Sequence, residues 1–413
     1  MLRATKYRIY PTEEQKVLLE KHFGCARLIY NFGLDLKNKT YQETGKSISK
    51  YDISNLLPEL KKTKEFLSEV NALSLQAALS NLETAFVKFF KKTAKYPNFK
   101  SKYSSKQSFQ IVQNVYIVGN KLDIPKFKEP IKIIVHRPIV GEIRTCTISR
   151  TSTNKYFISV LMDDKIELPT KLPLDFSKAV GIDLGIKTFA TLSTGEKFEN
   201  PKCLSKRQKY LARQQRILSR KEKGSKNRTK QKLVVAKIHE KITNKRKDFH
   251  HKLSRKIVDE NQVICIEDLA VKNMVQNRKL SKSISDCGWG QFVSYLQYKA
   301  DWKGHSVIKI GRFDPSSKMC SCGKINNNLQ LSDRTWTCKH CGSTHDRDIL
   351  AAKNILKFAT LRQNLVGQEL PDVKPPEKLS YSDLRKMVVK TTSVKEEKFK
   401  RTKKLVNLKL LGL

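Results

Sequence analysis

Three acidic residues stand at the ends of predicted elements, where a folded chain could bring them together. Asp183 closes an apolar run that predicts a strand, Glu267 closes a second such run, and Asp348 lies in the first turn of a predicted helix. Any one of them alone is more often a helix cap or a surface charge. As a set from separate elements, they supply the oxygen ligands that Mg²⁺ prefers. Two such ions, about 3.5–4 Å apart, stabilise both reacting oxygens of a phosphodiester displacement. The set therefore predicts two catalytic Mg²⁺, with Mn²⁺ as an alternative.

Four clustered cysteines form a second candidate metal site: Cys320, Cys322, Cys338 and Cys341. Two close-spaced pairs separated by a loop are typical of a tetrahedral zinc site, which predicts one structural Zn²⁺. The second pair has the usual CxxC spacing, whereas the first is a CxC and predicts a tighter turn. His340 or His345 could replace a sulfur ligand, and four buried free thiols are the alternative without metal. The other five of the nine cysteines are scattered singly, which favours a reducing interior over a secreted disulfide framework.

The charge balance indicates a polyanionic partner. The 413 residues carry 82 Lys+Arg against 39 Asp+Glu, a formal net charge of +43. Nucleic acid fits such a surface, because each neutralised phosphate releases condensed counterions. The excess concentrates in two predicted basic helices within residues 202–256, where Arg213, Arg216 and Arg220 are candidate phosphate contacts. His250 and His251 on the second of these helices are interpreted as surface or phosphate contacts. No apolar run approaches the ~20 residues that span a bilayer, so no membrane association is expected.

The period of the apolar residues divides the chain into segments. Residues 1–10 predict a strand, and the helices that follow begin with a capping box at Thr12 and Gln15. From about residue 107 to residue 165 the period is two, which predicts a small β-barrel or sandwich that the first strand joins. Strands and helices then alternate, as in an α/β layer domain. The Pro- and Lys-rich residues 367–413 predict a flexible basic tail.

Several motifs together resemble those of the TnpB (OrfB) proteins of insertion sequences, which are relatives of type V CRISPR effector nucleases. The resemblance covers nearly the whole chain. Three stretches are similar to the RuvC motifs of that family: 180–186, 266–269, and 346–348 with 351–355. Others are similar to its first helix, its junction after the helical lobe and its cysteine region: 23–31, 96–102, 314–318 and 331–338.

The resemblance implies a multidomain α+β fold. Its parts would be an RNase H-like (RuvC) α/β nuclease core with an inserted zinc ribbon, and a wedge β-barrel with an inserted α-helical recognition lobe. The implied bounds are 1–10 for the first wedge strand, 11–95 for the recognition lobe, 96–170 for the wedge barrel, 171–316 for the nuclease domain with its first two motifs, 317–345 for the zinc-ribbon, target-nucleic-acid-binding insert, 346–366 for the third-motif helix and 367–413 for the tail.

By residue match, the resemblance implies that Asp183, Glu267 and Asp348 are the metal-binding catalytic acids. Asp268 and Asp346 are adjacent alternatives. The family usually has Asn two residues after the last acid, where this chain has Leu350, so a supporting hydrogen bond could be missing. Further residues are candidate nucleic-acid contacts: Arg27, Tyr30, Asn31, Tyr96, Phe99, Lys100, Lys102 and Arg334.

The function that the resemblance implies is RNA-guided DNA cleavage. Such a protein would bind a guide RNA transcribed from its own transposon end, recognise a short adjacent motif in duplex DNA, open an R-loop and cut. It would act as a monomeric ribonucleoprotein in the cytoplasm of a prokaryotic host, associated with the nucleoid. Two alternatives are a nuclease-inactive RNA-guided DNA-binding regulator and a conventional RNase H-fold transposase.

Overall fold

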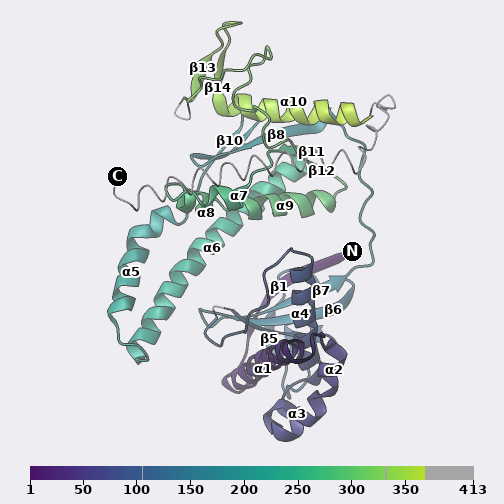
Figure 1. Ribbon diagram of the computed structural model, residues 1–413. Helices are drawn as coiled ribbons and strands as arrows, with labels where there is room; N and C mark the ends of the chain where they lie inside the picture. The colour runs from purple at the N-terminus through teal and green to yellow at the C-terminus, as the bar shows by residue number, and fades with distance from the viewer. Residues whose placement is uncertain (105, 331–332, 368–413) are drawn as a thin grey trace, which may run out of the picture. The chain divides into compact units, whose positions relative to one another are not determined.

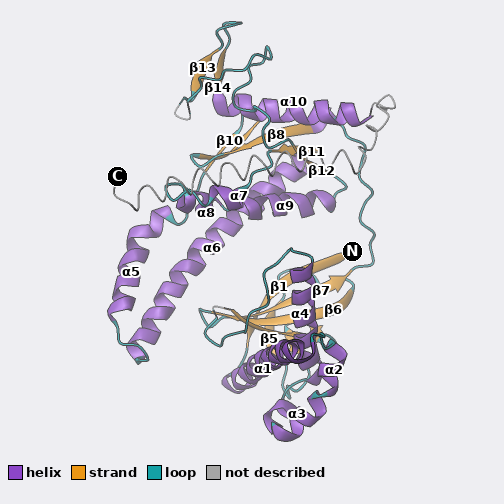
Figure 2. Cartoon of the chain, in the orientation of Figure 1, coloured by secondary structure: helices purple, strands orange, loops and turns teal. Residues whose placement is uncertain are grey.

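The computed structural model describes residues 1–104, 106–330 and 333–367 (Figure 1). Among its described helices, none is both long and apolar enough to cross a membrane. The predicted tail lies outside the described residues, except for its first position, Gly367, which ends α10. Figure 2 shows that the strands fall into separate sheets, each with its own helices or loops.

The N-terminal half combines four helices with a seven-stranded sheet. Its elements are β1 (Leu2–Tyr10), α1 (Glu13–Thr44), α2 (Lys50–Asn55), α3 (Leu57–Thr63), α4 (Ala72–Phe90), β2 (Lys106–Ile111), β3 (Tyr116–Val118), β4 (Lys121–Asp123), β5 (Ile131–Ile134), β6 (Glu142–Thr151) and β7 (Tyr156–Asp163). The predicted capping box is confirmed: the Thr12 side chain accepts from the Gln15 amide, and the Gln15 side chain accepts from the Thr12 amide. The apolar stripe of α1 is buried, as its spacing indicates.

The sheet of this half is antiparallel, in the order β2-β6-β7-β1-β5-β4-β3. The first strand joins this sheet, as predicted, and lies at its centre between β7 and β5. Strands β3 and β4 pair as a hairpin. The strand pairing is linear, and no described pair joins β2 to β3. The described strands therefore form an open sheet instead of a closed barrel. One apolar core joins this sheet to α1 and α4.

The second half is built on a five-stranded sheet in the order β10-β9-β8-β11-β12. Strands β8, β11 and β12 are parallel, while β8, β9 and β10 pair antiparallel. Its elements are β8 (Ala179–Leu184), β9 (Thr188–Leu192), β10 (Lys197–Glu199), α5 (Gln208–Arg220), α6 (Lys226–Glu260), β11 (Val263–Ile266), α7 (Val271–Met274), α8 (Ser281–Cys287), α9 (Trp289–Asp301), β12 (Ser306–Lys309), β13 (Thr335–Thr337), β14 (Thr344–Asp346) and α10 (Arg347–Gly367).

Helices cover both faces of the second sheet (Figure 1). Val180 and Ile182 of β8 pack with α6 and α9 in one apolar cluster. Side chains alternate along a strand, so Gly181 and Asp183 belong to the opposite face, which α10 covers. A Cβ on Gly181 would lie 2.0 Å from the carbonyl oxygen of Ala352. The absence of a side chain there allows α10 to rest directly on the backbone of β8.

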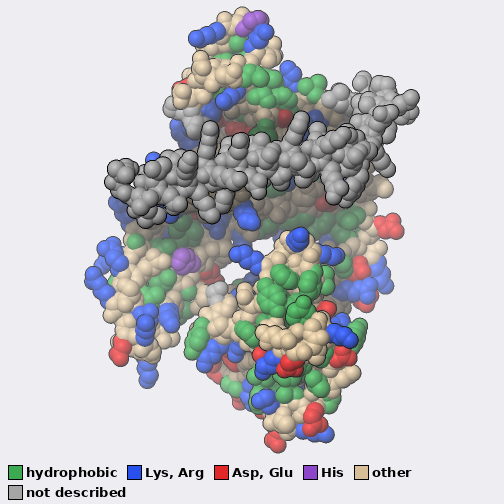
Figure 3. Space-filling model, in the orientation of Figure 1, with side chains coloured by type: hydrophobic (Ala, Val, Ile, Leu, Met, Phe, Trp, Pro, Cys, Tyr) green, Lys and Arg blue, Asp and Glu red, His purple; other side chains and the backbone are tan. Residues whose placement is uncertain are grey.

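Two further features extend from the second sheet. Helices α5 and α6 are the two predicted basic helices, and they form a hairpin whose connection includes Gly224 and Ser225. Arg228 closes the connection by donating to the carbonyl oxygens of Leu218 and Lys221, both at 2.7 Å. Lys and Arg side chains are spread over the visible face of this hairpin (Figure 3). The second feature is the pair β13–β14, which lies between β12 and α10 in the chain.

Candidate active site

Two of the three predicted acids leave neighbouring parallel strands at the same sheet edge. The register pairs Ile266 of β11 with Ile182 of β8, so Glu267 and Asp183 are the next residues along these strands. Val263 and Cys265 pack on the α10 side of the sheet. By strand alternation, Glu267 continues that side. Both carboxylates therefore belong to the face that α10 covers.

The third acid reaches this edge from α10. The backbone amides of Asp348 and Ile349 both donate to Asp346 Oδ1, at 3.1 Å. Asp346 thus caps the helix, and its other oxygen accepts from Lys197 Nζ at 2.7 Å. Asp348 is not needed as a cap. Its carboxylate lies 3.6 Å from the guanidinium of Arg334.

Asp183, Glu267 and Asp348 line one cavity of about 950 Å³. Arg334, Arg347 and Trp289 also line it. Burial, together with the negative charges of Glu267 and Asp348, raises the pKa of Asp183 to about 8, and the two arginines oppose this shift. Glu267 and Asp348 are therefore close enough to Asp183 to disfavour its ionisation.

The two alternative acids, Asp268 and Asp346, interact with other side chains outside the cavity. Asp268 accepts from Arg312 at 2.6 Å, and neither Asp268 nor Asp346 lines the cavity. Asp286 also lines the cavity, but its carboxylate accepts from the Leu204 amide and lies 3.5 Å from the guanidinium of Arg246. The remaining carboxylates of the cavity are the three predicted ones, which come from three elements. Such hard oxygen donors fit Mg²⁺ or Mn²⁺. A divalent cation would also stabilise the ionised form of Asp183, whose pKa is raised first by burial and then by the charges of Glu267 and Asp348.

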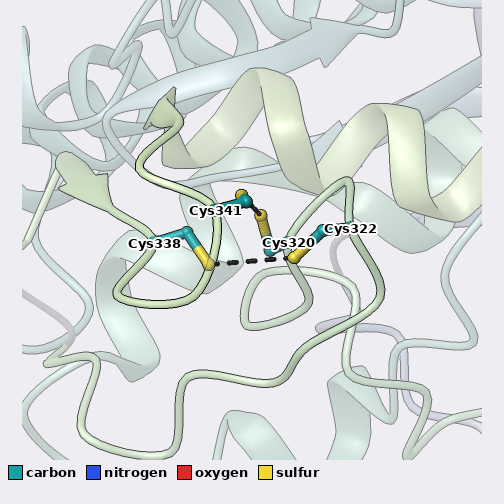
Figure 4. Close-up of side chains that lie close together, drawn as sticks. All are labelled: Cys320, Cys322, Cys338 and Cys341. Atoms are coloured by element: carbon teal, nitrogen blue, oxygen red, sulfur yellow. Dashed lines mark hydrogen bonds between the residues drawn. The ribbon is translucent and has the colours of Figure 1, made fainter.

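The four clustered cysteines converge from two loops (Figure 4). Their sulfur atoms all lie within 4.8 Å of one another. Cys320 Sγ is 3.6 Å from Cys341 Sγ, and Cys322 Sγ is 3.8 Å from Cys338 Sγ. A tetrahedral site with Zn–S bonds of about 2.3 Å requires separations of about 3.8 Å between sulfurs. The CxC pair therefore joins the CxxC pair in a group that could hold a zinc ion.

The neighbours of this group clarify two sequence predictions. His345 Nε2 lies 3.0 Å from Cys320 Sγ, so it is placed to hydrogen-bond a ligand sulfur. His340 is exposed. Hydrogen bonding with Ser343 lowers the pKa of Cys341 to about 6, which favours the thiolate that zinc requires. Leu350 is buried with Cys320, Trp336 and Cys338, so the position where the family usually has Asn belongs to an apolar cluster.

Most of the predicted contacts near residues 96–102 hold the N-terminal half together. Asn31 Nδ2 donates to the carbonyl oxygen of Lys100, and the Lys100 amide donates to Asn31 Oδ1, at 2.9 and 2.7 Å. Lys100 Nζ lies 3.8 Å from the centre of the Tyr30 ring. Two further hydrogen bonds connect predicted contacts to the rest of this half: the Tyr96 hydroxyl donates to Asn38, and Arg27 donates to Gln107.

The predicted contacts of this segment are all exposed: Tyr96, Phe99, Lys100 and Lys102. Arg27, Asn31 and Phe99 line a cavity of about 400 Å³. The structure therefore brings part of this predicted group together around one hollow. Their contact with nucleic acid stays a prediction.

On the basic hairpin, Arg213, Arg216 and Arg220 are exposed on α5 at spacings that place them on one face. The prediction for His250 is wrong. Its side chain is 1% exposed, its Nε2 lies 2.9 Å from the carbonyl oxygen of Cys287, and its ring packs on Phe189 at 5.2 Å. The apolar stripe of α6 includes this position, and that spacing was the available signal. His251 is exposed, as predicted, and stacks on Tyr295.

Two polar residues near the acids were not predicted from the sequence to have a role in the site. Ser316 donates its hydroxyl to Glu267 Oε1 at 2.5 Å. Asn354 is buried and donates to the carbonyl oxygens of Ser316 and Met319, at 2.7 and 2.6 Å. Both belong to stretches that resemble family motifs, which was the only signal in the sequence.

Fold and site together define a basic, mixed α/β protein with a carboxylate-lined cavity beside a four-cysteine cluster. Within that class, the chain belongs to the TnpB (OrfB) family. Residues 160–278 match the OrfB_IS605 family, described as "Probable transposase", and residues 289–355 match the "Cas12f1-like, TNB domain". Residues 1–46 match a domain described as helix-turn-helix, although here they hold β1 and the single long helix α1.

Relatives match along most of the chain. A protein from Streptomyces pristinaespiralis, provisionally named RNA-guided DNA endonuclease, is 45% identical over 360 residues, covering 86% of this chain and 88% of the relative. InsQ of Escherichia coli K12, with the same provisional name, is 31% identical over 374 residues, covering 86% and 92%. Among solved structures, a complex of Cas12f1 with sgRNA and target DNA gives a TM-score of 0.47 at 15% identity, covering 86% of this chain and 98% of that one.

Proposed function

We propose that this protein is a transposon-encoded, RNA-guided DNA endonuclease. It would bind a guide RNA from the element's end, recognise a short adjacent motif, form an R-loop and hydrolyse phosphodiester bonds of the target DNA. Membership in the TnpB family supports guidance by RNA. The single observation that carries the nuclease assignment is the cavity lined by Asp183, Glu267 and Asp348.

In the proposed reaction, the three carboxylates would hold two Mg²⁺. When bound, these ions stabilise the negative charge that develops on the attacking and leaving oxygens. Water oxygen forms the new bond to phosphorus, and the bond from phosphorus to the leaving sugar oxygen breaks. Asp183 and Glu267 contribute from the rigid ends of paired strands, and α10 presents Asp348 across from them. Arg334, beside Asp348, adds a positive charge at the cavity wall for the phosphate.

The other parts of the chain have supporting roles in this proposal. One structural zinc held by Cys320, Cys322, Cys338 and Cys341 would fix the loops that precede α10. Pairing between guide and target would carry sequence specificity, while the protein supplies a cationic surface for the backbones. The exposed arginines of α5 are one such surface. Phe99 and Lys102 are exposed candidates in the N-terminal half.

The test is to express the full chain with the DNA that flanks its gene, purify the complex and sequence any bound RNA. The complex is then given Mg²⁺ and a plasmid with a guide-matched target beside a randomised flank. Cleavage should depend on the match, on particular flanking sequences and on the RNA. Cleavage unchanged after RNase treatment and repurification would reject guidance. Guided binding without cutting would favour the regulator, and RNA-independent strand joining would favour the conventional transposase.

A further inference from the structure

The second acid of the cavity is held by a side chain outside the sheet. Ser316 lies after β12, in the loop that leads to the cysteines, and is buried. Its hydroxyl donates to Glu267 Oε1 at 2.5 Å. A carboxylate oxygen that accepts this bond is fixed in orientation, which leaves Oε2 as the oxygen that can turn toward a cation. Strand β11 ends before Glu267, so the strand alone does not fix this side chain.

The loop that carries Ser316 is in turn fixed to α10. Asn354 is 3% exposed, and its amide nitrogen donates to the carbonyl oxygens of Ser316 and Met319. Both hydrogens of this amide are therefore used within the protein. Asn354 lies on the same helix as Asp348. One buried amide thus ties the loop that orients Glu267 to the helix that carries the third acid.

The same amide lies next to the cysteine cluster. Met319, whose carbonyl accepts from Asn354, immediately precedes Cys320. The Cys320 amide donates to the carbonyl oxygen of Lys324 at 2.8 Å, which closes the turn of the CxC pair. A continuous path of short contacts runs from Cys320 through Asn354 and Ser316 to Glu267. Order imposed on the turn at Cys320 is therefore transmitted to the carboxylate.

We propose that Ser316 is a positioning residue for Glu267 and that Asn354 couples this contact to the four-cysteine cluster. Zinc in the cluster then sets how tightly the acid cavity holds its divalent cation. The inference rests on the proposed function, because it takes Glu267 as a cation ligand. Partners that orient metal ligands typically contribute ten- to a hundredfold to metal affinity.

The experiment measures binding of Mn²⁺, as a probe for Mg²⁺, from the loss of its free electron paramagnetic resonance signal. It uses the full-length, zinc-loaded protein freed of nucleic acid, with Asp183→Ala as the reference for nonspecific binding. Ser316→Ala should weaken specific Mn²⁺ binding by about ten- to a hundredfold, and Ser316→Thr should restore it. Asn354→Asp should also weaken it. Asn327→Asp, an exposed change of the same kind, and Ser294→Ala on α9 should have wild-type affinity.

A thermodynamic cycle tests the coupling itself. Cys341→Ser, with zinc content verified by mass spectrometry, should weaken Mn²⁺ binding in the wild-type background but add little to Ser316→Ala. Equal, additive losses in both backgrounds would show that the path does not pass through Ser316. Wild-type Mn²⁺ affinity in Ser316→Ala, with binding abolished in Asp183→Ala, would overturn this inference and leave the proposed function standing. Unchanged binding in Asp183→Ala would overturn both.

Discussion

Gly181 of β8 lies directly against the backbone of Ala352 in α10, so that a Cβ on Gly181 would stand 2.0 Å from the Ala352 carbonyl oxygen. The amide nitrogen of Leu356 would be 2.9 Å away. Backbone atoms of a helix cannot rotate aside as a side chain can. This contact therefore sets how closely α10, with Asp348, approaches the sheet edge that carries Asp183.

Gly181→Ala should push α10 off the sheet. We expect a loss of about 2–3 kcal/mol in the free energy of unfolding, the range for overpacking a core, and severe loss of cleavage as Asp348 moves from Asp183. Chemical denaturation and plasmid cleavage measure the two effects. Gly290→Ala is the matched control, because a Cβ there meets nothing within 4 Å. Equal behaviour of the two variants would contradict the close contact.

Asp183→Asn should abolish target cleavage and leave guided DNA binding intact. The variant keeps the shape of the side chain but lacks the charge that a divalent cation needs. Cleavage on a gel and binding by filter retention separate the two activities. Cutting at the wild-type rate by this variant would remove Asp183 from the site.

The same substitution should change how stability depends on pH. The pKa of Asp183 is raised to about 8 in the folded, cation-free protein, above the value of about 3.9 in an unfolded chain. The folded state then binds more protons, so stability falls as the pH rises from about 4 toward 8. In magnesium-free buffer, thermal unfolding of Asp183→Asn should lack this part of the pH dependence.

Burial of His250 should make the protein sensitive to acid. Burial lowers the pKa of His250 to about 4, whereas the unfolded side chain titrates near 6.5. The unfolded state therefore binds the extra proton first, and about 2–3 kcal/mol of stability should be lost as the pH falls from about 6.5 to 4. His250→Phe should flatten that slope in denaturation curves. His239→Phe, an exposed change on the same helix, should retain it.

Leu350→Asn, which restores the residue usual in the family, should not raise the cleavage rate. Leu350 is buried against Cys320, Trp336 and Cys338, where an amide would lose apolar contacts and lack assured partners. We expect a cost of about 2 kcal/mol or more and faster loss of zinc to a chelator. Zinc release followed with a colorimetric dye measures it. Leu361→Asn, an exposed change on the same helix, should release zinc at the wild-type rate.

Replacing Arg213, Arg216 and Arg220 together by Gln should weaken binding of guide RNA and reduce its salt dependence. If each arginine neutralises one phosphate, the slope of log K against log salt should fall by about 2–3. Fluorescence anisotropy with labelled guide, repeated across salt concentrations, gives the slope. Gln215→Ala, an exposed neutral change on α5, should leave it unaltered. An unchanged slope in the triple variant would exclude this face from RNA binding.

Local patterns predicted what depends on short stretches of chain. The capping box at Thr12 and the strand before Asp183 follow from neighbouring residues, and both are present. The grouping of the three acids was predicted from their residue type, from their places at the ends of separate elements and from the motifs that resemble the TnpB family. Contacts between segments that are distant in the sequence could be found only from the folded structure. The hydrogen bonds of Ser316 with Glu267 and of Asn31 with Lys100 join residues far apart in the sequence, and the spacing of apolar residues does not predict them.

For His250, the residue type led to a wrong prediction of its burial. Its charge-bearing type and its histidine neighbour suggested the surface, but its place on the apolar stripe of α6 decided its burial. The described strands of the first sheet leave it open because its two edge strands do not pair, which strand content alone does not predict. The sequence predicted which acids and which cysteines lie together, and it failed for the single side chain of His250.

The position of α10 in the chain bears on when the protein becomes able to cut. During synthesis, the strands that carry Asp183 and Glu267 leave the ribosome before the four cysteines, and Asp348 emerges only after them. A nascent chain can therefore complete its N-terminal half and its basic hairpin while its nuclease sheet still lacks one covered face and one acid. Chains arrested at the cysteines would have the basic hairpin but not Asp348. Under the proposed function, capture of a guide would therefore come before the capacity to cleave DNA.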